Sequence, residues 1–485
     1  MALNRSLPAT PPTFAPHAEA LARVPRALAV RHDALPLSLA DGVLAVALAE
    51  PGDDAVLDAL RAATHLPIRA VQMPRDAIRE RLRFAYGTSP AESRERAGDG
   101  PAARAVDLVF ARAIAAHASD VHVEPAVGGG RVRIRVDGVL RELETIGTDL
   151  FPAFVSRLKV LAAMDVADRR QPQDGRYSIP YEQREIDARV SSVPTIGGEK
   201  LVVRLLDRYA AAPDLDALGM PSPLLERYRA AIGAPWGFVV LTGPTGSGKT
   251  TTLYASLVRL DAGTRSICSV EDPVEMRLAD IAQVQVNVRA GVGFPTVLRA
   301  FMRQDPNVVV IGEMRDGETA AVAVSAALAG QTVFTTLHAN DAPRTIDRLI
   351  ELGVSRHSLA AALTVIVGQR LVRTLCERCR IRVAIPAAVR ERLGGDHEHW
   401  YVAGGCRGCE GSGYQGRTGV YELLAVDDAL RDAIATGASS VHVAQLAART
   451  GYRALREDAL AKVVSGITSF DELTRVAGWG GPTWA

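Results

Sequence analysis

A glycine-rich segment, LTGPTGSGKTTTLYASL at residues 241–257, limits the possible folds of this chain more than any other part of the sequence. Residues 243–250 fit the pattern G-x-x-x-x-G-K-[ST], which is typical of a phosphate-binding loop. The apolar residues 238–241 predict a buried strand before this loop, and residues 251–260 predict a helix after it. The alternative is a glycine-rich turn that contains a lysine by chance, and such a turn would need neither the strand before it nor the helix after it. The order of strand, loop and helix therefore favours a phosphate site.

The residue types in the loop fit the chemistry of a bound nucleotide. Glycines let the backbone wrap around a phosphate so that its N–H groups point inward, and the N-terminal end of the following helix faces the same anion. Lys249 is predicted to reach the terminal phosphates, and the Thr250 hydroxyl is predicted to ligate Mg²⁺. The predicted nucleotide-binding residues are Gly243, Pro244, Thr245, Gly246, Ser247, Gly248, Lys249, Thr250 and Thr251.

Composition indicates an ordinary globular protein of several domains. The chain has 485 residues, 48% of them apolar and 23% charged, which leaves room for about three domains. No apolar run reaches the roughly 18 residues of a membrane-spanning helix, and the first residues lack the apolar core of a signal peptide, so we expect a cytoplasmic location. The formal net charge of +1 indicates no general attraction to nucleic acid, and no nucleic-acid partner is expected.

Shifts in composition along the chain predict six segments. Short apolar runs in the first segment indicate a small α/β module, and the Ser-, Pro- and Gly-containing stretch TSPAESRERAGDGP predicts a linker. Alternating segments such as RVRIRVDGVL then predict the strands of an α+β domain. Apolar strands that alternate with helical segments follow, as in a parallel sheet covered by helices. The predicted boundaries are 1–87, 88–101 for the linker, 102–212, 213–375 for the phosphate-loop domain, 376–423 for a cysteine-containing segment, and 424–485 for a helical C-terminal region.

Acidic and polar side chains follow three predicted strands of the phosphate-loop domain. Glu271 and Glu275 follow the strand at 267–270, Glu313 follows 308–311, and His338 follows 333–337. Each acid alone could be a solvated loop end, and a lone histidine is often structural. Because ligands of an open α/β sheet bind at the carboxyl ends of its strands, the shared placement favours roles at the phosphates and at Mg²⁺.

Four of the five cysteines form two C-x-x-C pairs, Cys376/Cys379 and Cys406/Cys409. In a reducing compartment such pairs indicate a tetrahedral Zn²⁺ site, although the gap between them is longer than the most familiar spacing. A redox-active pair is the alternative, but two pairs without a thioredoxin-like pattern disfavour it. Four thiolates leave no open position for water, so the predicted zinc is structural. Cys268 lies in an apolar run and is predicted to be a small buried side chain.

The motifs GPTGSGKTTTLY, EDPVE, RQDPNVVVIGEMRD and TTLHAND resemble, in this order, the Walker A, aspartate, Walker B and histidine motifs of the bacterial secretion ATPases, the GspE/PilB superfamily. The resemblance extends over about 102–475 and is greatest to the type II secretion ATPases, the GspE family. It implies a P-loop (RecA-like) α/β ATPase domain, with Glu313 as the catalytic glutamate, Glu271 and Glu275 as the acidic motif, and His338 as a phosphate-sensing histidine. Met314 and Pro295 depart from the usual pattern.

The resemblance also implies a hexamer in which arginines of the second N-terminal domain reach a nucleotide. Arg176, Arg189 and Arg204 are the candidates for this role here. A guanidinium at that place stabilises the charge that develops on the transferred phosphoryl group. The alternative for each is a strand arginine that is paired with a neighbouring acid, and the sequence does not choose among the three.

The resulting functional hypothesis is an ATPase motor at the cytoplasmic face of the inner membrane that uses ATP, Mg²⁺ and Zn²⁺ and drives pseudopilus assembly in type II secretion. The implied partners are membrane platform proteins, namely the cytoplasmic domain of a GspL-like protein and a GspF-like membrane protein, with the N-terminal module as the docking part. A type IV pilus assembly ATPase (PilB-like) is the nearest alternative. A DNA-translocating conjugation ATPase and a nucleotide-gated scaffold without turnover are the hypotheses from other classes.

Overall fold

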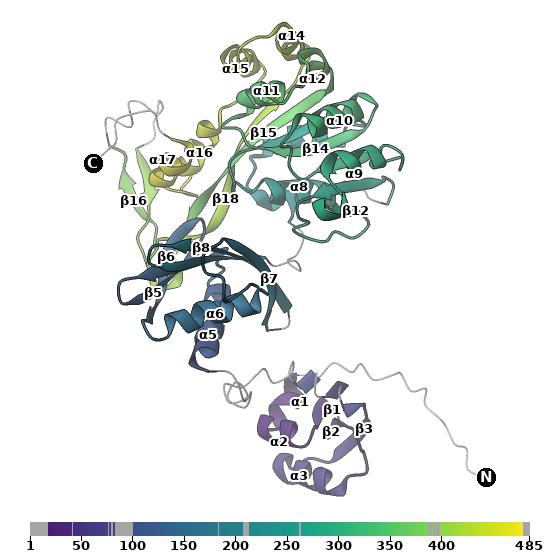
Figure 1. Cartoon of the computed structure of the whole chain (residues 1–485), viewed down its shortest axis with the longest axis vertical. Coiled ribbons are helices and arrows are strands. Elements are labelled where there is room, and N and C mark those ends of the chain that lie inside the picture. The colour runs from purple at the N-terminus through teal and green to yellow at the C-terminus, as the bar shows by residue number, and fades with distance from the viewer. Residues whose placement is uncertain are drawn as a thin grey trace, which may run out of the picture. The chain divides into compact units, whose positions relative to one another are not determined.

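The computed structural model describes residues 18–40, 42–75, 77–78, 81–82, 100–182, 184–206, 213–260, 263–386, 390 and 398–478. Contacts divide the chain into two units (Figure 1). The first unit runs to Ile134 and includes Glu142–Leu205, and the second comprises Arg135–Arg141 and the chain from Leu206 onward. Most of the predicted linker, residues 88–99, lies outside the described residues.

The N-terminal part of the first unit is a small α/β module. Its three-stranded sheet has the order β1-β2-β3, with β1 and β2 antiparallel and β2 and β3 parallel. The strands are rich in valine, leucine and alanine, and β2 is buried along almost its whole length. The elements are α1 (Ala18–Arg23), α2 (Arg26–Arg31), β1 (Leu35–Ala40), β2 (Val43–Leu48), α3 (Asp54–Thr64) and β3 (Ile68–Gln72).

The remainder of the first unit contains a six-stranded sheet of order β6-β5-β4-β9-β8-β7 together with two helices. Strands β5 and β9 alternate between buried apolar and partly exposed polar side chains, as the sequence predicts for half-buried strands. On the covered face, the ring of Phe110 in α5 packs edge-on against Tyr177 in β7. The elements are α5 (Pro101–Ala115), β4 (Asp120–Ala126), β5 (Gly129–Val136), β6 (Val139–Gly147), α6 (Phe151–Leu161), β7 (Gln173–Tyr181), β8 (Arg184–Thr195) and β9 (Gly198–Leu206).

A seven-stranded sheet of order β12-β11-β13-β14-β10-β15-β18 forms the centre of the second unit. The paired strands are parallel except for β15 and β18, which are antiparallel. The continuous apolar runs of β10 and β13 are buried because helices cover both faces. The predicted parallel α/β fold is therefore confirmed. The strands are β10 (Gly237–Thr242), β11 (Ile267–Glu271), β12 (Ala282–Gln285), β13 (Val308–Ile311), β14 (Thr332–Leu337), β15 (Leu363–Leu375) and β18 (Tyr414–Ala425).

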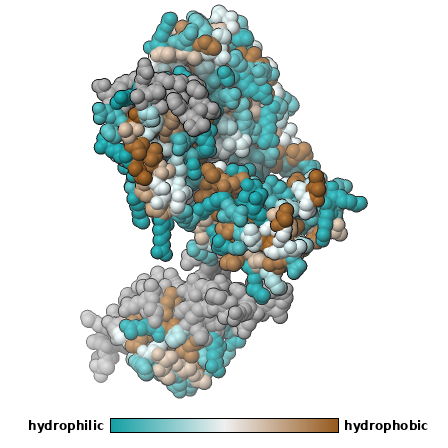
Figure 2. All heavy atoms as spheres, turned by 90° about the vertical axis from the view of Figure 1, so that its left-hand side faces the viewer, coloured by the Kyte–Doolittle hydropathy of each residue, from teal (hydrophilic) through white to brown (hydrophobic). Residues whose placement is uncertain are grey.

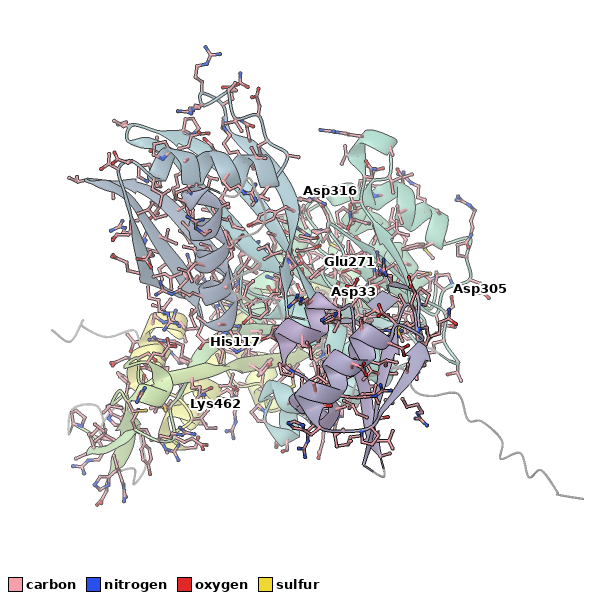
Figure 3. The ribbon with its side chains drawn as sticks, turned by 90° about the horizontal axis from the view of Figure 1, so that it is seen from below. Asp33, His117, Glu271, Asp305, Asp316 and Lys462 are labelled. Atoms are coloured by element: carbon pink, nitrogen blue, oxygen red, sulfur yellow. The ribbon has the colours of Figure 1, made fainter. Side chains whose placement is uncertain are left out.

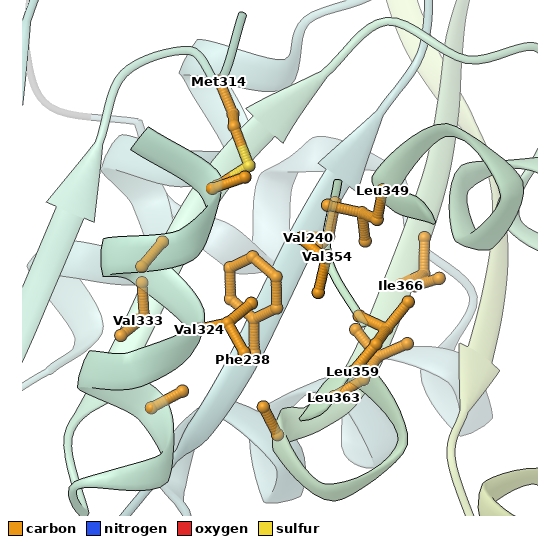
Figure 4. Close-up of a cluster of buried hydrophobic side chains, with 14 of the residues drawn as sticks. Phe238, Val240, Met314, Val324, Val333, Leu349, Val354, Leu359, Leu363 and Ile366 are labelled. Carbon is orange, nitrogen blue, oxygen red and sulfur yellow. The ribbon is translucent and has the colours of Figure 1, made fainter. Parts of the chain in front are cut away.

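Helices and sheet share a dense aliphatic core, in which Phe238 of β10 lies among Val324, Val333 and neighbouring side chains (Figure 4). Met314, a departure from the family pattern, is buried in this core. Pro295 lies in the first turn of α9, where a missing N–H costs no hydrogen bond. The covering helices are α7 (Ser222–Gly233), α8 (Lys249–Arg259), α9 (Phe294–Phe301), α10 (Gly317–Leu328), α11 (Ala342–Glu351) and α12 (Arg356–Ala362).

Local residues mark both ends of α10. Asp316 is the N-cap, and its carboxylate accepts a hydrogen bond of 2.8 Å from the N–H of Thr319. Gly330, just beyond the helix, has a φ of 101°, a conformation that favours glycine. Local sequence signals thus place the helix that follows the Walker B segment.

In the sequence, the cysteine segment lies between β15 and β18, the antiparallel strand pair at one side of the sheet. Beyond β15 the chain forms a small hairpin of β16 (Ile381–Ala384) and β17 (His399–Val402) and returns as β18. Strand β18 begins inside the predicted 376–423 segment and belongs to the ATPase sheet. The C-terminal region then contains α14 (Asp428–Thr436), α15 (Ser440–Arg449), α16 (Leu455–Val464) and α17 (Phe470–Ala477).

The surface carries mainly hydrophilic side chains with small apolar areas between them on the face seen in Figure 2. Among the described residues, no helix combines the length and the hydropathy needed to cross a membrane.

Candidate active site and metal centre

The phosphate-binding loop lies between β10 and α8, as the sequence predicts. Gly248, the residue before α8, has a φ of 87°. A Cβ there would lie only 2.7 Å from Nε2 of the Gln369 side chain. A Cβ on Gly243 would lie 2.5 Å from the carbonyl oxygen of Gln369. Only glycine fits these two places, so the loop backbone can approach a ligand closely.

Lys249 is buried and donates hydrogen bonds to two backbone carbonyls of its own loop, those of Gly243 at 2.7 Å and Pro244 at 3.1 Å. Burial lowers the pKa of Lys249 to about 8, and the charge of Arg370 acts in the same direction. The buried hydroxyl of Ser247 has no hydrogen-bond partner among the described residues. A buried cation held only by carbonyls, beside an orphaned hydroxyl, fits a site whose missing partner is an anion.

Glu313 follows β13 and lies close to His338, which follows the neighbouring strand β14. Oε1 of Glu313 is 3.1 Å from Nε2 of His338, and Oε2 accepts a hydrogen bond of 2.8 Å from Arg315. Burial alone would raise the pKa of Glu313, but the Arg315 hydrogen bond and the charges of Arg315, His338 and Lys249 lower it. Glu313 is therefore a carboxylate at neutral pH, as a group that orients water requires.

Register between β13 and β14 brings Glu313 and His338 together. Ile311 pairs with Thr335, so both strands end at the same edge of the sheet. The Thr336 hydroxyl donates a hydrogen bond of 2.8 Å to the carbonyl of Gly312, and the N–H of Met314 donates one to the carbonyl of Thr336. These bonds fix the turn that carries Glu313.

Glu271, labelled in Figure 3, is the last residue of β11 and is buried. Its carboxylate accepts hydrogen bonds from the hydroxyls of Ser269, at 2.6 Å, and Tyr254. Gly312 lies against this residue, since a Cβ on Gly312 would meet the Cα of Glu271 at 3.2 Å. The space that Glu271 occupies therefore explains the glycine before the Walker B glutamate.

Glu275 lies in the loop after β11 and is half-buried. Its N–H donates a hydrogen bond of 3.1 Å to the hydroxyl of Tyr254, the same residue that binds Glu271. The two acids of this predicted motif are thus connected through one tyrosine of α8.

The three predicted arginines lie on the six-stranded sheet of the first unit. Arg176 and Arg189 are register partners on β7 and β8, so their side chains share one face. This is the face opposite Tyr177, whose ring packs on α5. Nε of Arg204 lies 3.2 Å from the carboxylate of Asp120, which is the ion pair that the alternative interpretation expects for a strand arginine.

Sequence analysis missed three polar residues at this site: Arg315, Gln369 and Arg370. A basic residue two positions after the predicted catalytic carboxylate was an available signal for Arg315. Gln369 is buried on β15 and accepts a hydrogen bond of 2.8 Å from the hydroxyl of Thr252. Arg370 donates hydrogen bonds to the carbonyls of Gln369 and Asn340. No local motif in the sequence marks β15 as part of the phosphate site.

The four predicted metal ligands converge at the end of the β15–β18 pair. Their sulfur atoms all lie within 4.8 Å of one another, and three Sγ–Sγ distances are 3.9 Å for Cys376 and Cys406, 3.7 Å for Cys379 and Cys409, and 3.7 Å for Cys406 and Cys409. Four ligands at the Zn–S distance of about 2.3 Å in a tetrahedron have edges of about 3.8 Å. The four thiols fit one tetrahedral ion.

Backbone N–H groups also point at these sulfur atoms. Those of Cys406 and Gly413 each lie 3.2 Å from Sγ of Cys409 and, together with the neighbouring thiols, lower its pKa to about 6. The N–H of Gly405 donates to Cys379 at the same distance, although the neighbouring thiols raise the pKa of that residue. Such donors stabilise thiolates, which are the form that binds metal.

A cavity of about 360 Å³ lies elsewhere in the second unit, at the C-terminal end of α8. Arg229, Arg259 and Arg265 are among its lining residues. It contains none of the predicted site residues, so it is separate from the phosphate site.

Comparison with known proteins agrees with this geometry. Residues 95–475 match the family described as type II/IV secretion system protein, and residues 6–92 match the MshEN domain. The type II secretion system protein E of Klebsiella pneumoniae is 39% identical over 489 residues, which cover 95% of this chain and 98% of that protein. The type IV pilus assembly ATPase PilB of Myxococcus xanthus strain DK1622 is 38% identical over 93% of this chain and 85% of that protein.

The crystal structure of the pilus retraction motor PilT with bound ADP is similar as well, with a TM-score of 0.53 and 25% identity over 78% of this chain and 97% of that one. Fold and phosphate loop together define a RecA-like P-loop ATPase, an enzyme that hydrolyses ATP and uses Mg²⁺. The chain belongs to the type II/IV secretion system protein family. The expected family is therefore confirmed.

Proposed function

We propose that this protein is the assembly motor of a type II secretion system, which converts ATP hydrolysis into domain motion and so drives pseudopilus growth. The observation that carries this proposal is the contact of Glu313 with His338 at the edge of the sheet where Lys249 and the phosphate loop lie. ATP hydrolysis requires a cation that binds the phosphates and a carboxylate that orients the water, and this site contains both.

Each site residue has a proposed role in hydrolysis. Lys249 leaves its two carbonyls and binds the terminal phosphates, while the loop from Gly243 to Thr251 surrounds them with N–H groups. Glu313 orients the attacking water, and His338 contacts the terminal phosphate. Glu271 and Glu275 would hold Mg²⁺ through its water shell, and the ion would offset the negative charge of the phosphates.

The second N-terminal domain is proposed to complete the site in a hexamer. Arg189 and Arg176 lie side by side on one strand pair, an arrangement that places two positive charges at neighbouring positions and favours contact with an anion. Arg204 would have to exchange its partner Asp120 for a phosphate. Arg176 and Arg189 are therefore the stronger proposals of the three.

The tetracysteine cluster is proposed to hold one structural Zn²⁺. The sulfur distances fit a tetrahedral ion, and the four cysteines fill all of its positions. No water-activating role is proposed for it. The four thiolates would hold the ion at the end of the β15–β18 pair, where its binding would contribute to folding of this segment.

Location and partners follow from the same proposal. The motor acts at the cytoplasmic face of the inner membrane, where the module within residues 1–87 docks on the cytoplasmic domain of a GspL-like protein and the motor domains act on a GspF-like membrane protein. We propose the predicted segments 102–212, 213–375, 376–423 and 424–485 as the parts of the motor, with residues 88–101 as its tether.

A type IV pilus assembly motor is the second function to test, because the PilB relative of Myxococcus xanthus is about as similar as the type II relative. Deletion of the gene in its own organism distinguishes the two. Loss of an exported enzyme from the culture medium with intact surface pili supports type II secretion. Loss of pili with normal secretion supports pilus assembly and overturns the first proposal.

A further inference from the structure

The histidine loop, residues 338–341, connects β14 to α11 and carries the side chain that contacts Glu313. It crosses the end of β10, where the N–H of Ala339 donates a hydrogen bond of 3.1 Å to the hydroxyl of Thr242. Asp341 ends the loop and caps α11 through the N–H of Arg344, at 2.8 Å. The position of His338 therefore depends on the contacts that hold the loop at the end where α11 begins.

A buried carboxylate on β18 binds the residue that follows the loop. Oε1 of Glu422 accepts a hydrogen bond of 2.7 Å from the N–H of Ala342, the first residue of α11. Oε2 accepts bonds from the hydroxyl of Tyr452, at 2.7 Å, and from the N–H of Leu455, the first residue of α16, at 3.1 Å. Glu422 is only 1% exposed. One carboxylate thus joins the start of α11 to the start of α16.

Gly368 provides the space for this carboxylate. It pairs with Glu422 across β15 and β18, and a Cβ built on it would lie 2.3 Å from Oε1. The three nearest atoms to that Cβ all belong to Glu422. An alanine at position 368 would displace the carboxylate before it touched anything else.

Arg370 holds the loop from the side of the phosphate site. Its Nη2 donates a hydrogen bond of 2.7 Å to the carbonyl of Asn340, and its Nη1 donates one of 2.9 Å to the carbonyl of Gln369. Among the described residues, Arg370 forms no ion pair. Arg370 and Glu422 therefore bind backbone groups of residues 340 and 342, on either side of Asp341.

We propose that Glu422 and Arg370 are positioning residues for ATP hydrolysis, which hold the histidine loop so that His338 stays in contact with Glu313. Neither residue has a role in the function proposed above, although this inference rests on the roles given there to Glu313 and His338. Because Glu422 also binds the start of α16, the C-terminal helices and the catalytic loop share one anchor. A shift of a reacting group by about 1 Å costs as much as a hundredfold in rate, so loss of this anchor should be visible in kcat.

A double-mutant cycle between positions 368 and 422 tests this inference in the full-length protein. Glu422→Ala and Gly368→Ala should each lower kcat by about tenfold to a hundredfold with little change in KM for ATP. In the double variant, the added methyl group occupies the space left by the carboxylate, so its kcat should equal that of Glu422→Ala alone. Additive losses would overturn the inference.

Three further variants keep the test decisive. Asp427→Asn alters another helix-capping carboxylate of the same unit, which binds the N–H of Leu430 at 2.9 Å, and it should leave kcat unchanged. Tyr452→Phe removes one donor from Glu422 and should lower kcat less than Glu422→Ala, even if the latter folds poorly. Arg370→Ala should lower kcat, whereas an increase in KM alone would make Arg370 a nucleotide ligand and overturn its positioning role.

Thermal unfolding measurements distinguish a loss of loop positioning from a general loss of structure. If the melting temperatures of the variants fall while kcat per folded protein stays at the wild-type value, Glu422 is only structural and the inference is wrong. If the wild-type protein hydrolyses ATP and Glu313→Gln does so equally well, the proposed roles at the site fail independently of this cycle.

Discussion

Oε1 of Glu313 lies 3.1 Å from Nε2 of His338, and this contact joins the ends of two neighbouring parallel strands. In the sequence these residues are 25 positions apart and belong to separate motifs. Their contact brings a carboxylate that can orient water next to an imidazole that can contact a phosphate.

The burial of Lys249 predicts an unusual dependence of stability on pH. Its pKa is about 8 in the folded protein and 10.5 as an ordinary lysine, so the unfolded chain binds more protons between these values. The cost of burying the charge is therefore complete below pH 8 and is relieved as the pH rises to 10.5. Without nucleotide, Lys249→Met should melt at a higher temperature than wild type at pH 7, and this difference should shrink toward pH 10.5.

Lys249→Arg is the control for this pH dependence, since its guanidinium stays charged over the whole range. The difference in melting temperature between Lys249→Arg and Lys249→Met should persist at high pH. A wild-type protein that is more stable than Lys249→Met at pH 7 without nucleotide would contradict the burial cost.

The cysteine cluster predicts about one zinc ion per chain, because one set of four thiolates fills one tetrahedral site. Cys406→Ser should lose the ion and have a lower melting temperature than the wild type, while its affinity for nucleotide should change little. Cys268→Ala should keep the ion, since Cys268 is buried in the ATPase core, apart from the cluster. Elemental analysis of reduced protein that finds no zinc would remove the proposed role.

Much of the ATPase sheet can be predicted from local sequence, because each parallel strand is a short apolar run that ends at a polar or glycine-rich loop. Glu313 and His338 were found for that reason. Arg370 and Glu422 were not, since β15 and β18 pair across the intervening cysteine segment and no local pattern identifies the partner of either strand. The same long connection explains why sequence analysis placed residues 414–423 with the cysteines rather than in the sheet.

The arginine proposal predicts that assembly controls activity. A site completed by Arg176 or Arg189 needs one domain to close over a nucleotide in a ring, so dilute monomer should hydrolyse ATP slowly and the rate per chain should rise with concentration. Arg189→Ala should lower kcat in the assembled ring, by about 10³ or more if it acts as an arginine finger. A strictly monomeric protein that matches the rate of the ring would contradict the proposal.

Arg204 has a matched control in its partner Asp120. If Arg204 only forms that ion pair, Arg204→Ala and Asp120→Ala should have similar effects on stability and leave kcat unchanged. A loss of kcat in Arg204→Ala alone would give Arg204 a role at the nucleotide.

Deletion of residues 1–85 should separate recruitment from chemistry. This module has its own core, built on the β1-β2-β3 sheet, so its removal should leave the ATPase unit folded and active. The truncated protein should fail to associate with the inner membrane and to support secretion in cells. Membrane association and normal secretion by the truncated protein would show that docking uses another part of the chain.

The most direct test of the central claim is a comparison of nucleotide binding and phosphate release in wild type, Glu313→Gln and Lys249→Ala. Lys249→Ala removes a charge-assisted contact to the phosphates and should weaken ATP binding by about a hundredfold or more. Glu313→Gln should bind ATP with wild-type affinity and release no phosphate, because the amide keeps the shape of the side chain but cannot take up a proton from water. If Glu313→Gln releases phosphate at the wild-type rate, Glu313 is not the catalytic carboxylate and the account of this site is wrong.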